Sequence, residues 1–190
     1  MRLGFRVERF IGADLLQQKN IEILAENVQI RENKQTIGEL DCLLLKDGKP
    51  FHLEIIYKLY LYDENVGTNE IDHWIGGNRR DSFAKKLEKL KEKQLPLLYN
   101  PHTKPLLDSL NLKEEDIEQR VHFRAQLFVP FQKKVEFNLL NEQCLKGFFI
   151  RPKELGRFKN FEFFIPFKRD WLIEPQEDVD WMTYQTFKEK

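Results

Sequence analysis

The sequence predicts a mixed α+β fold, a central sheet flanked by helices in the order helix, three strands, helix, strand (αβββαβ). Residues 3–18 carry apolar side chains at the spacing of an amphipathic helix. Two apolar runs, residues 36–46 and 51–62, then meet at Asp47-Gly48, the strongest short-range signal for a β-hairpin. A second helical pattern and a further strand complete the predicted order.

The remaining elements of the first half have their own local signals. Residues 21–30 contain the apolar positions of a strand, and residues 63–77 form a polar loop. Asn78, followed by Asp81 three positions later, resembles a capping box. The second helix is therefore expected to begin there and to extend to about Lys93.

The second half of the chain has a less regular pattern. Whether residues 95–98 form a strand is undecided, because these residues include a proline. Beyond it the pattern predicts a helix, two strands, a short helix, a further strand and a terminal helix, at residues 111–119, 121–131, 147–150, 152–156, 161–167 and 181–188. We expect a single domain over residues 1–190, with its core at 3–98 and an extension of the sheet at 111–190.

The composition excludes several classes of protein. The chain has 190 residues, of which 41% are hydrophobic and 33% charged, as in a folded globular protein. Its two cysteines give neither a disulfide framework nor a zinc pattern, and no apolar run is long enough to span a membrane. It has neither a glycine-rich phosphate loop nor a serine-nucleophile motif. We expect a cytoplasmic protein that does not bind membranes.

The predicted hairpin places two carboxylates side by side. With Asp47 and Gly48 at the centre of a type I′ turn, Asp41 lies opposite Glu54 in a non-hydrogen-bonded pair, with Cβ atoms about 4.5–5.5 Å apart. Like charges in this position destabilise a hairpin, and a divalent cation would relieve the repulsion. Mg²⁺ prefers one or two carboxylates completed by water and phosphate oxygens. Asp41 and Glu54 are therefore candidate ligands for Mg²⁺ or Mn²⁺.

A second interpretation treats this face as the ordinary, half-exposed side of an antiparallel hairpin. Lys58 would then reach Glu39 diagonally, and His52 would be solvated rather than a neighbour of the site. Ile56 on the same face argues against full exposure, since a partly buried acid pair is costly without a partner.

Charged and aromatic residues are concentrated locally although the net charge is zero. Residues 79–93 hold seven bases against three acids, which suits either a phosphate backbone or a solvated helix face with Lys–Glu pairs. The aromatic run from Phe158 to Trp171 could stack on bases, but a core strand with a charged rim is the simpler interpretation. Between Asp170 and Asp180 lie five acids and no base, which argues against nucleic acid on that surface.

The motifs around the hairpin resemble two known groups of proteins. The order of the predicted elements resembles the PD-(D/E)XK nuclease superfamily, which has a restriction-endonuclease-like core. This order is a helix, a strand, a strand with Asp, a turn, and a strand with Glu followed by Lys. A closer similarity, over about residues 3–98, is to the bacterial family called domain of unknown function 1853. It is carried by Gly38-Glu39-Leu40-Asp41, His52-Leu53-Glu54, Lys58-Leu59-Tyr60-Leu61, Gly77-Asn78 through Asp81 and Lys85, and Gln94-Leu95, with weaker similarity at Lys146-Gly147-Phe148 and Trp171.

The nuclease resemblance implies roles for individual residues. Asp41 and Glu54 would bind the metal, Lys58 would orient the attacking water, and Glu8 would be the acid of the first helix. The superfamily places its Lys two positions after the Glu, where this chain has Ile56, so Lys58 lies about 6–7 Å farther along the strand.

These observations predict a Mg²⁺-dependent nuclease that hydrolyses phosphodiester bonds of nucleic acid, with DNA as the first candidate. The supporting and phosphate-contacting candidates are Glu39 and His52 around the acids, and Asn78, Arg79, Arg80 and Lys85 toward the nucleic acid. Two alternatives stay open. One is a catalytically inactive module of the same fold that binds nucleic acid or a protein partner, and the other is a structural interaction domain that uses the aromatic second half.

Overall fold

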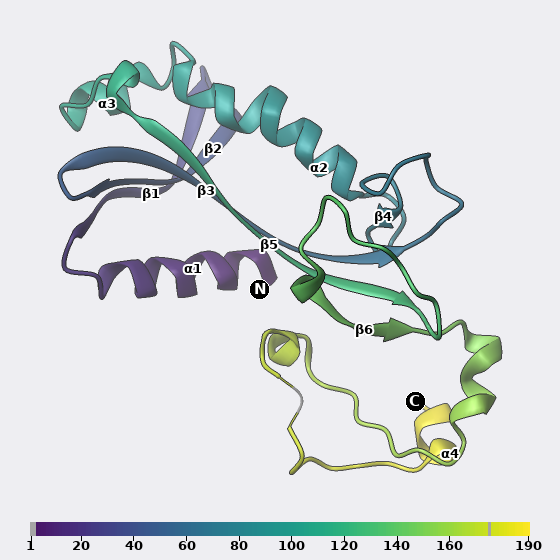
Figure 1. Cartoon of the computed structure of the whole chain (residues 1–190). Helices are drawn as coiled ribbons and strands as arrows, with labels where there is room; N and C mark the ends of the chain where they lie inside the picture. Colours follow the sequence, from purple (N-terminus) through teal and green to yellow (C-terminus); the bar gives the residue numbers. More distant parts are fainter. Residues whose placement is uncertain (1–2, 175) are drawn as a thin grey trace.

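The computed structural model describes residues 3–174 and 176–190 and confirms a mixed α+β architecture with an open sheet (Figure 1). The six strands of the sheet are β1 (Ile21–Glu32), β2 (Gln35–Lys46), β3 (Lys49–Tyr62), β4 (Trp74–Ile75), β5 (Glu118–Pro130) and β6 (Leu145–Phe149). The α-helices are α1 (Leu3–Leu16), α2 (Phe83–Lys89), α3 (Lys104–Ser109) and α4 (Tyr184–Lys188). A π-helical turn, η1 (Leu90–Gln94), continues α2, and the 3₁₀ segments are η2 (Leu95–Tyr99), η3 (Glu114–Asp116), η4 (Glu142–Cys144), η5 (Pro152–Phe158) and η6 (Lys168–Leu172).

The β2–β3 hairpin has the register predicted from its turn. Asp47 and Gly48 both have positive φ, 51° and 77°, as a type I′ turn requires. Lys46 pairs with Lys49 across this turn, and the pairing continues outward to Cys42 and Leu53. The predicted hairpin and its register are thus confirmed.

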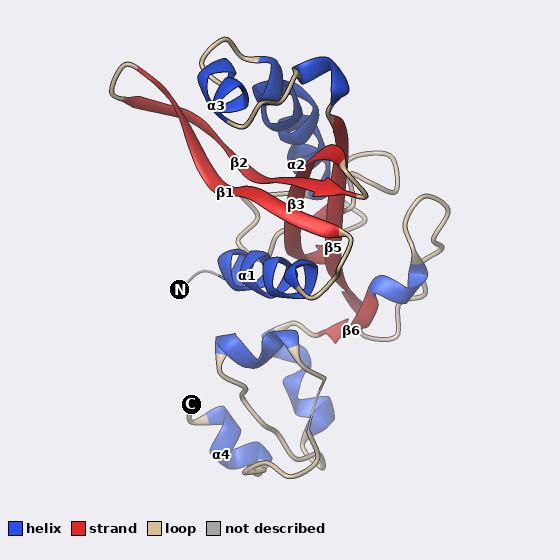
Figure 2. Cartoon of the chain, turned by 90° about the vertical axis from the view of Figure 1, so that its left-hand side faces the viewer, coloured by secondary structure: helices blue, strands red, loops and turns tan. Residues whose placement is uncertain are grey.

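Strand β3 lies at the centre of the sheet. It pairs antiparallel with β2 on one edge and parallel with β5 on the other, from Phe51↔Glu118 to Leu61↔Phe128. A parallel neighbour requires a crossover connection, which here contains α2, η1, η2 and α3. Figures 1 and 2 show this crossover on one face of the sheet and α1 on the other.

Two buried apolar clusters hold the crossover on the sheet. The first joins Leu40 and Leu43 of β2 to Leu97 and Leu98 of η2. The second surrounds β3, α2 and β5 and is built from Tyr60, Trp74, Phe83, Leu127 and Val129. Burial of such side chains stabilises the fold by about 1.5–3 kcal/mol each. The crossover is therefore packed directly onto the sheet.

On the face of the hairpin that carries the acids, the β3 residues are buried, whereas Asp41 of β2 is half-buried and Glu39 is exposed. The interpretation of this face as an ordinary half-exposed side is therefore wrong for its β3 part. His52 and Glu54 are each 0% exposed and Ile56 is 2% exposed. The sequence of the hairpin alone could not reveal this, because the cover is supplied by the crossover that follows it.

The start of the second helix differs from the prediction. Helix α2 begins after Ser82, whose Oγ accepts a hydrogen bond from the backbone N–H of Lys85 at 3.2 Å. Asn78 does not cap it, and its side-chain oxygen instead accepts from the N–H of Arg80. The ambiguous residues 95–98 lie in η2 and are not a strand.

Two predicted elements of the second half are wrong. The helix at residues 111–119 is reduced to η3, because strand β5 already begins at Glu118 to pair with β3. In place of the strand at residues 161–167 there is only an isolated bridge, between Phe163 and Met182. In the described part of the chain the sheet therefore ends with β6.

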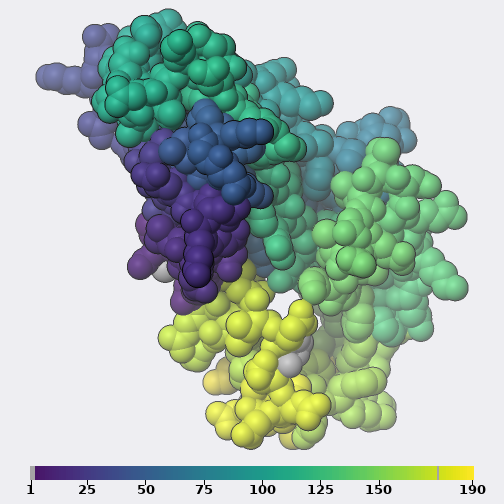
Figure 3. Space-filling model, turned by 60° about the vertical axis from the view of Figure 1, so that its left-hand side comes forward, coloured from purple at the N-terminus to yellow at the C-terminus, as the bar shows by residue number. Residues whose placement is uncertain are grey.

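Residues 150–174 and 176–190 follow the sheet and contain η5, η6 and α4 joined by loops. Figures 2 and 3 show this C-terminal segment next to α1, at one end of the molecule. Across the described residues, no helix combines the length and the apolar character needed to cross a membrane.

Candidate functional site

Asp41 marks the point at which β2 separates from β3. The backbone pairing of the two strands stops at Cys42↔Leu53, one step before the two acids. The Oδ2 atom of Asp41 accepts a hydrogen bond from the backbone N–H of Ile55 at 2.7 Å. The carboxylate thus takes the place of a backbone partner and lies beside the β3 residue that follows Glu54.

Glu54 lies beneath the crossover with both carboxylate oxygens engaged. Its Oε1 lies 3.0 Å from Nε2 of His52, and its Oε2 accepts from the side-chain amide of Gln94 at 2.6 Å. Each oxygen of a carboxylate can accept more than one bond, so both keep accepting capacity. A buried carboxylate needs such partners, because its desolvation is otherwise costly.

His52 extends this network to the neighbouring strand. Its Nδ1 lies 2.9 Å from the amide nitrogen of Gln119, which also donates to the carbonyl of Leu95 at 2.8 Å. Because the Gln119 amide can only donate, Nδ1 accepts and the proton resides on Nε2, which donates to Glu54. The expectation of a solvated His52 is wrong, since the ring is buried and orients a site carboxylate.

Lys86 of α2 is the cation of this neighbourhood. Its Nζ donates to the side-chain oxygen of Gln94 at 2.6 Å, and Gln94 in turn donates to Glu54. A chain of hydrogen bonds therefore runs from an ammonium on the crossover helix to a buried carboxylate on the central strand.

The pKa of Asp41 is raised to about 7. Burial is the largest cause, followed by repulsion from Glu54 and, more weakly, from Glu8. The N–H of Ile55 and the ammonium of Lys86 act in the opposite direction. Two carboxylates that share a poorly solvated space in this way favour either a bound proton or a bound cation.

The same electrostatic neighbourhood includes Glu8 of α1. Its pKa is raised, first by burial and then by Glu39 and Glu54, whereas Lys86 lowers it. The pKa of Lys86 is itself lowered, by burial and then by neighbouring lysines, although Glu54 and Asp41 favour its charged form. The structure thus brings Glu8, predicted only from the resemblance, near the two hairpin acids.

Lys58 has a different partner from the acids. Its Nζ lies 2.5 Å from Oδ2 of Asp81, and both side chains are about one-third exposed, at 37% and 35%. Asp81 immediately precedes the cap of α2, so this pair connects β3 to the start of the crossover. Glu39 is exposed at the edge of the acid neighbourhood.

The four candidate nucleic-acid contacts gather at the exposed turn before α2 and in its first turn. Asn78 caps the N–H of Arg80, and Arg79 pairs with Asp63 at 2.8 Å. The ammonium of Lys85 donates to the carbonyl of Arg80 at 3.4 Å. Arg80 is exposed, and its guanidinium forms no ion pair with a residue that the structure describes.

A metal ion at this site would depend on Asp41 and Glu54. Within residues 3–174 and 176–190, no group of three or more His, Cys, Asp or Glu side chains could hold a metal ion by itself. The second oxygen of Asp41, Oδ1, forms no hydrogen bond in that part of the chain. Two acids with spare accepting capacity fit Mg²⁺, which completes its shell with water and phosphate oxygens.

Three residues of the network were not predicted from the sequence. Lys86 lay within the basic run of the second helix and Gln94 within a motif of the family resemblance, but neither pattern distinguished them from their neighbours. Gln119 had no signal at all. Lys86 and Gln94 reach Glu54 from the crossover, and Gln119 reaches His52 from the neighbouring strand β5. No local pattern describes either encounter.

Comparison with known proteins gave one match. A family model with the description "Domain of unknown function (DUF1853)" matches residues 1–189. No curated protein and no solved structure matches the chain.

Proposed function

We propose that this chain, which belongs to the DUF1853 family, is a Mg²⁺-dependent, nuclease-like protein. It would hydrolyse phosphodiester bonds of nucleic acid, with DNA as the first candidate. The observation that carries the proposal is the pair Asp41 and Glu54, brought together where β2 leaves β3. Their mutual repulsion in a poorly solvated place is the condition that a divalent cation relieves.

The order of the elements supports a restriction-endonuclease-like core of the PD-(D/E)XK type. Helix α1, strands β1 to β3, the crossover with α2, and strand β5 follow one another as αβββαβ. In that arrangement Asp41 comes from the second strand and Glu54 from the third. The placement in this superfamily is part of the proposal.

Asp41 and Glu54 hold the Mg²⁺ ion, which when bound polarises the phosphate and lowers the pKa of its water. Gln94 and His52 fix the orientation of the Glu54 carboxylate through hydrogen bonds of 2.6 and 3.0 Å. Glu8 adds negative charge to the same neighbourhood.

Lys86 stabilises the negative charge that develops on the phosphate. Its charged form is favoured by Glu54 and Asp41, and it stands on the helix that covers them. Lys58, the candidate implied by the superfamily pattern, would first have to leave Asp81 before it could orient a water. The exposed turn with Asn78, Arg79 and Arg80, together with Lys85, would contact the backbone of the nucleic acid.

A catalytically inactive module of the same fold is the second candidate. The ion pair between Lys58 and Asp81 favours it, because that pair occupies the lysine on which the superfamily relies. Such a module would bind nucleic acid or a protein partner and would not hydrolyse either.

The test has a binding step and an activity step. Thermal melting with Mg²⁺ or Mn²⁺ is expected to raise the Tm of the native protein, and Asp41→Asn should lose this shift. Asp14→Asn, an exposed acid of α1, is the matched control and should keep it. Incubation of plasmid, linear duplex and single-stranded DNA with Mn²⁺ should then show cleavage that Asp41→Asn and Glu54→Gln abolish.

The outcomes separate the two candidates. A metal-dependent shift without cleavage of any substrate supports the inactive module. Absence of both the shift and the cleavage overturns the nuclease proposal.

A further inference from the structure

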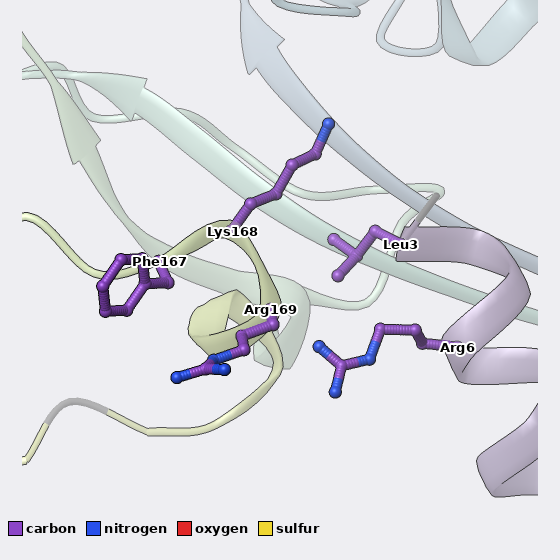
Figure 4. Close-up of a pocket in the computed structure, with 5 residues that line it drawn as sticks. All are labelled: Leu3, Arg6, Phe167, Lys168 and Arg169. Atoms are coloured by element: carbon purple, nitrogen blue, oxygen red, sulfur yellow. The ribbon is translucent and has the colours of Figure 1, made fainter. Parts of the chain in front are cut away.

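The C-terminal segment encloses two adjoining cavities that the acid site does not use. The smaller, about 610 Å³, lies between α1 and η6 and is lined by Leu3, Arg6, Phe167, Lys168 and Arg169 (Figure 4). The larger, about 970 Å³, lies between the sheet and residues 164–174, 176 and 181. Leu3 and Lys168 line both, so the two spaces meet at these side chains.

The smaller cavity is cationic. All three of its charged residues are bases and none is an acid. Arg169 pairs with Asp170 at 3.4 Å and also lies over the ring of Phe167. Arg6 and Lys168 form no ion pair with any described residue. Figure 4 shows the Lys168 ammonium pointing away from the Arg6 guanidinium, so the two uncompensated cations offer two separate points of attraction for an anionic strand.

The acids that line the larger cavity are neutralised. Asp81 pairs with Lys58, and Glu174 pairs with Lys146 at 3.1 Å. The expectation that the acids after residue 169 repel nucleic acid therefore does not apply to Asp170 and Glu174, since each has a basic partner. The charge left over around both cavities is that of Arg6 and Lys168.

Aromatic side chains of the segment are exposed and are not part of a core strand. Phe164 is 40% exposed, Phe167 70%, Trp171 41% and Trp181 48%. Phe164 and Trp181 form an edge-to-face pair, and the carbonyl of Trp171 is tied to β5 by the side-chain amide of Gln126 at 3.1 Å. Exposed aromatic faces beside cations are the surface on which unpaired bases stack.

A tyrosine that lines the larger cavity has a buried hydroxyl, unpaired within the described part of the chain. The hydroxyl oxygen of Tyr57 is buried and has no hydrogen-bond partner among the described residues. Tyr57 lines the cavity from the central strand.

We propose that this cleft binds unpaired nucleotides of a nucleic-acid strand, with bases against Trp171 and its aromatic neighbours and separate phosphates of the strand against Arg6 and Lys168. This inference rests on the proposed function in taking nucleic acid as the ligand, and it adds that the strand is single. The cavity volumes are those of small-ligand pockets, which admit single nucleotides. A duplex keeps its bases paired and stacked on one another, so it cannot place them against these aromatic rings.

The test measures binding of fluorescein-labelled (dT)12, and of the same length of duplex, by anisotropy with the full chain in EDTA, so that no hydrolysis occurs. The native protein is expected to bind the single strand more tightly than the duplex. Arg6→Ala and Lys168→Ala should each weaken this binding about five- to tenfold and reduce the salt slope by about 0.7. Arg9→Ala on α1 and Lys188→Ala on α4 remove exposed cations outside both cavities and should leave the affinity unchanged.

Stacking is tested separately. Trp171→Leu should weaken binding of (dT)12 about tenfold or more, whereas Trp171→Phe, which keeps a flat ring, should restore most of it. Melting temperatures of all variants establish that each one folds. Equal affinity for single strand and duplex, or equal effects in cleft and control variants, overturns the proposal.

The binding of (dT)12 is measured independently of catalysis. Cleavage by a protein whose cleft variants bind normally would sink the inference and leave the nuclease proposal standing. Binding that depends on the cleft residues, without cleavage by the native protein or any variant, would support the cleft and overturn the nuclease proposal.

Discussion

Asp41 combines a backbone contact with an unfavourable charge. Its carboxylate receives one N–H bond from Ile55 at 2.7 Å, yet burial and Glu54 raise its pKa to about 7. The neighbouring Glu54 is held by His52 and Gln94. At the scale of single residues, two acids thus share a poorly solvated place, and the cation that we propose would relieve their repulsion.

The first prediction concerns pH and stability without metal. A folded-state pKa raised from 3.8 means that protonated Asp41 stabilises the fold at low pH, and this stability is lost as pH rises through about 7. Asp41→Asn mimics the protonated form, so in EDTA it should melt close to the native protein near pH 4 and about 2–8 °C higher near pH 8. Calorimetry across this range checks the prediction. A difference that stays constant with pH would contradict it.

The second prediction separates two lysines. If the protein cleaves nucleic acid, Lys86→Gln should lower the rate by about 100-fold or more, because it removes charge stabilisation next to the acids. Lys58→Gln should lower the rate less than about tenfold and reduce the Tm, since Asp81 loses its partner. Initial rates and melting curves give both quantities.

The exposed Lys91 supplies the control for this pair, and Lys91→Gln should leave rate and Tm unchanged. The reverse order, an inactive Lys58→Gln beside an active Lys86→Gln, would assign the superfamily role to Lys58.

At the scale of elements, the hairpin depends on its turn. Asp47 and Gly48 have φ of 51° and 77°, and a Cβ on Gly48 would meet nothing within 4 Å. Any cost of a side chain there is thus backbone strain, with no contribution from crowding.

The third prediction follows from this turn. Gly48→Ala should lower the free energy of unfolding by about 1–2 kcal/mol, the cost of a left-handed conformation in a residue with a Cβ. Gly156→Ala in η5 also adds a methyl to open space but without a positive φ, so it should be neutral or slightly stabilising. Urea unfolding of the two variants makes the comparison. Equal destabilisation by both would show that the turn is not the cause.

Elements that depend on distant partners were the ones predicted wrongly. Residues 118 and 119 favoured a helix locally but pair with β3, and residues 161–167 alternate like a strand but find no sheet edge among the described residues. Tertiary pairing outweighs local propensity in both places.

At the scale of the whole molecule, long connections are fixed by a few polar contacts. The Glu70 carboxylate accepts backbone N–H bonds from Asn138, Leu139 and Leu140 at 2.9, 2.8 and 3.0 Å. It thereby fastens the loop after β3 to the loop between β5 and β6. Burial alone would raise the pKa of Glu70, but the three N–H donors together lower it.

The fourth prediction tests this clamp. Because the folded-state pKa of Glu70 is lowered, its contribution to stability is present above about pH 4.5 and is lost as pH falls through the folded pKa. Glu70→Gln should therefore lower the Tm by about 2–6 °C at pH 7, with the difference shrinking toward pH 3. The exposed Glu136→Gln is the control and should show no such dependence. A Glu70→Gln variant that melts like the native protein at pH 7 would show that these hydrogen bonds do not stabilise the fold.

The sequence by itself determined the mixed α+β order, the bounds of α1 and β1 to β3 within a few residues, and the hairpin register. These follow from short-range rules: the turn residues fix φ, and the alternation of side chains fixes which residues share a face. Asp41 and Glu54 could be matched in the same way, because the match needs only the turn and a count along two strands.

Only the tertiary structure decided that Glu54 and His52 are buried, that Lys86 rather than Lys58 stands beside the acids, and that the aromatic C-terminal segment encloses a cleft. Each of these depends on a segment far away in sequence, the crossover or the C-terminal chain, lying against the hairpin. Burial and ion pairing belong to such encounters, since desolvation of a charge is set by whatever covers it and not by its neighbours along the chain.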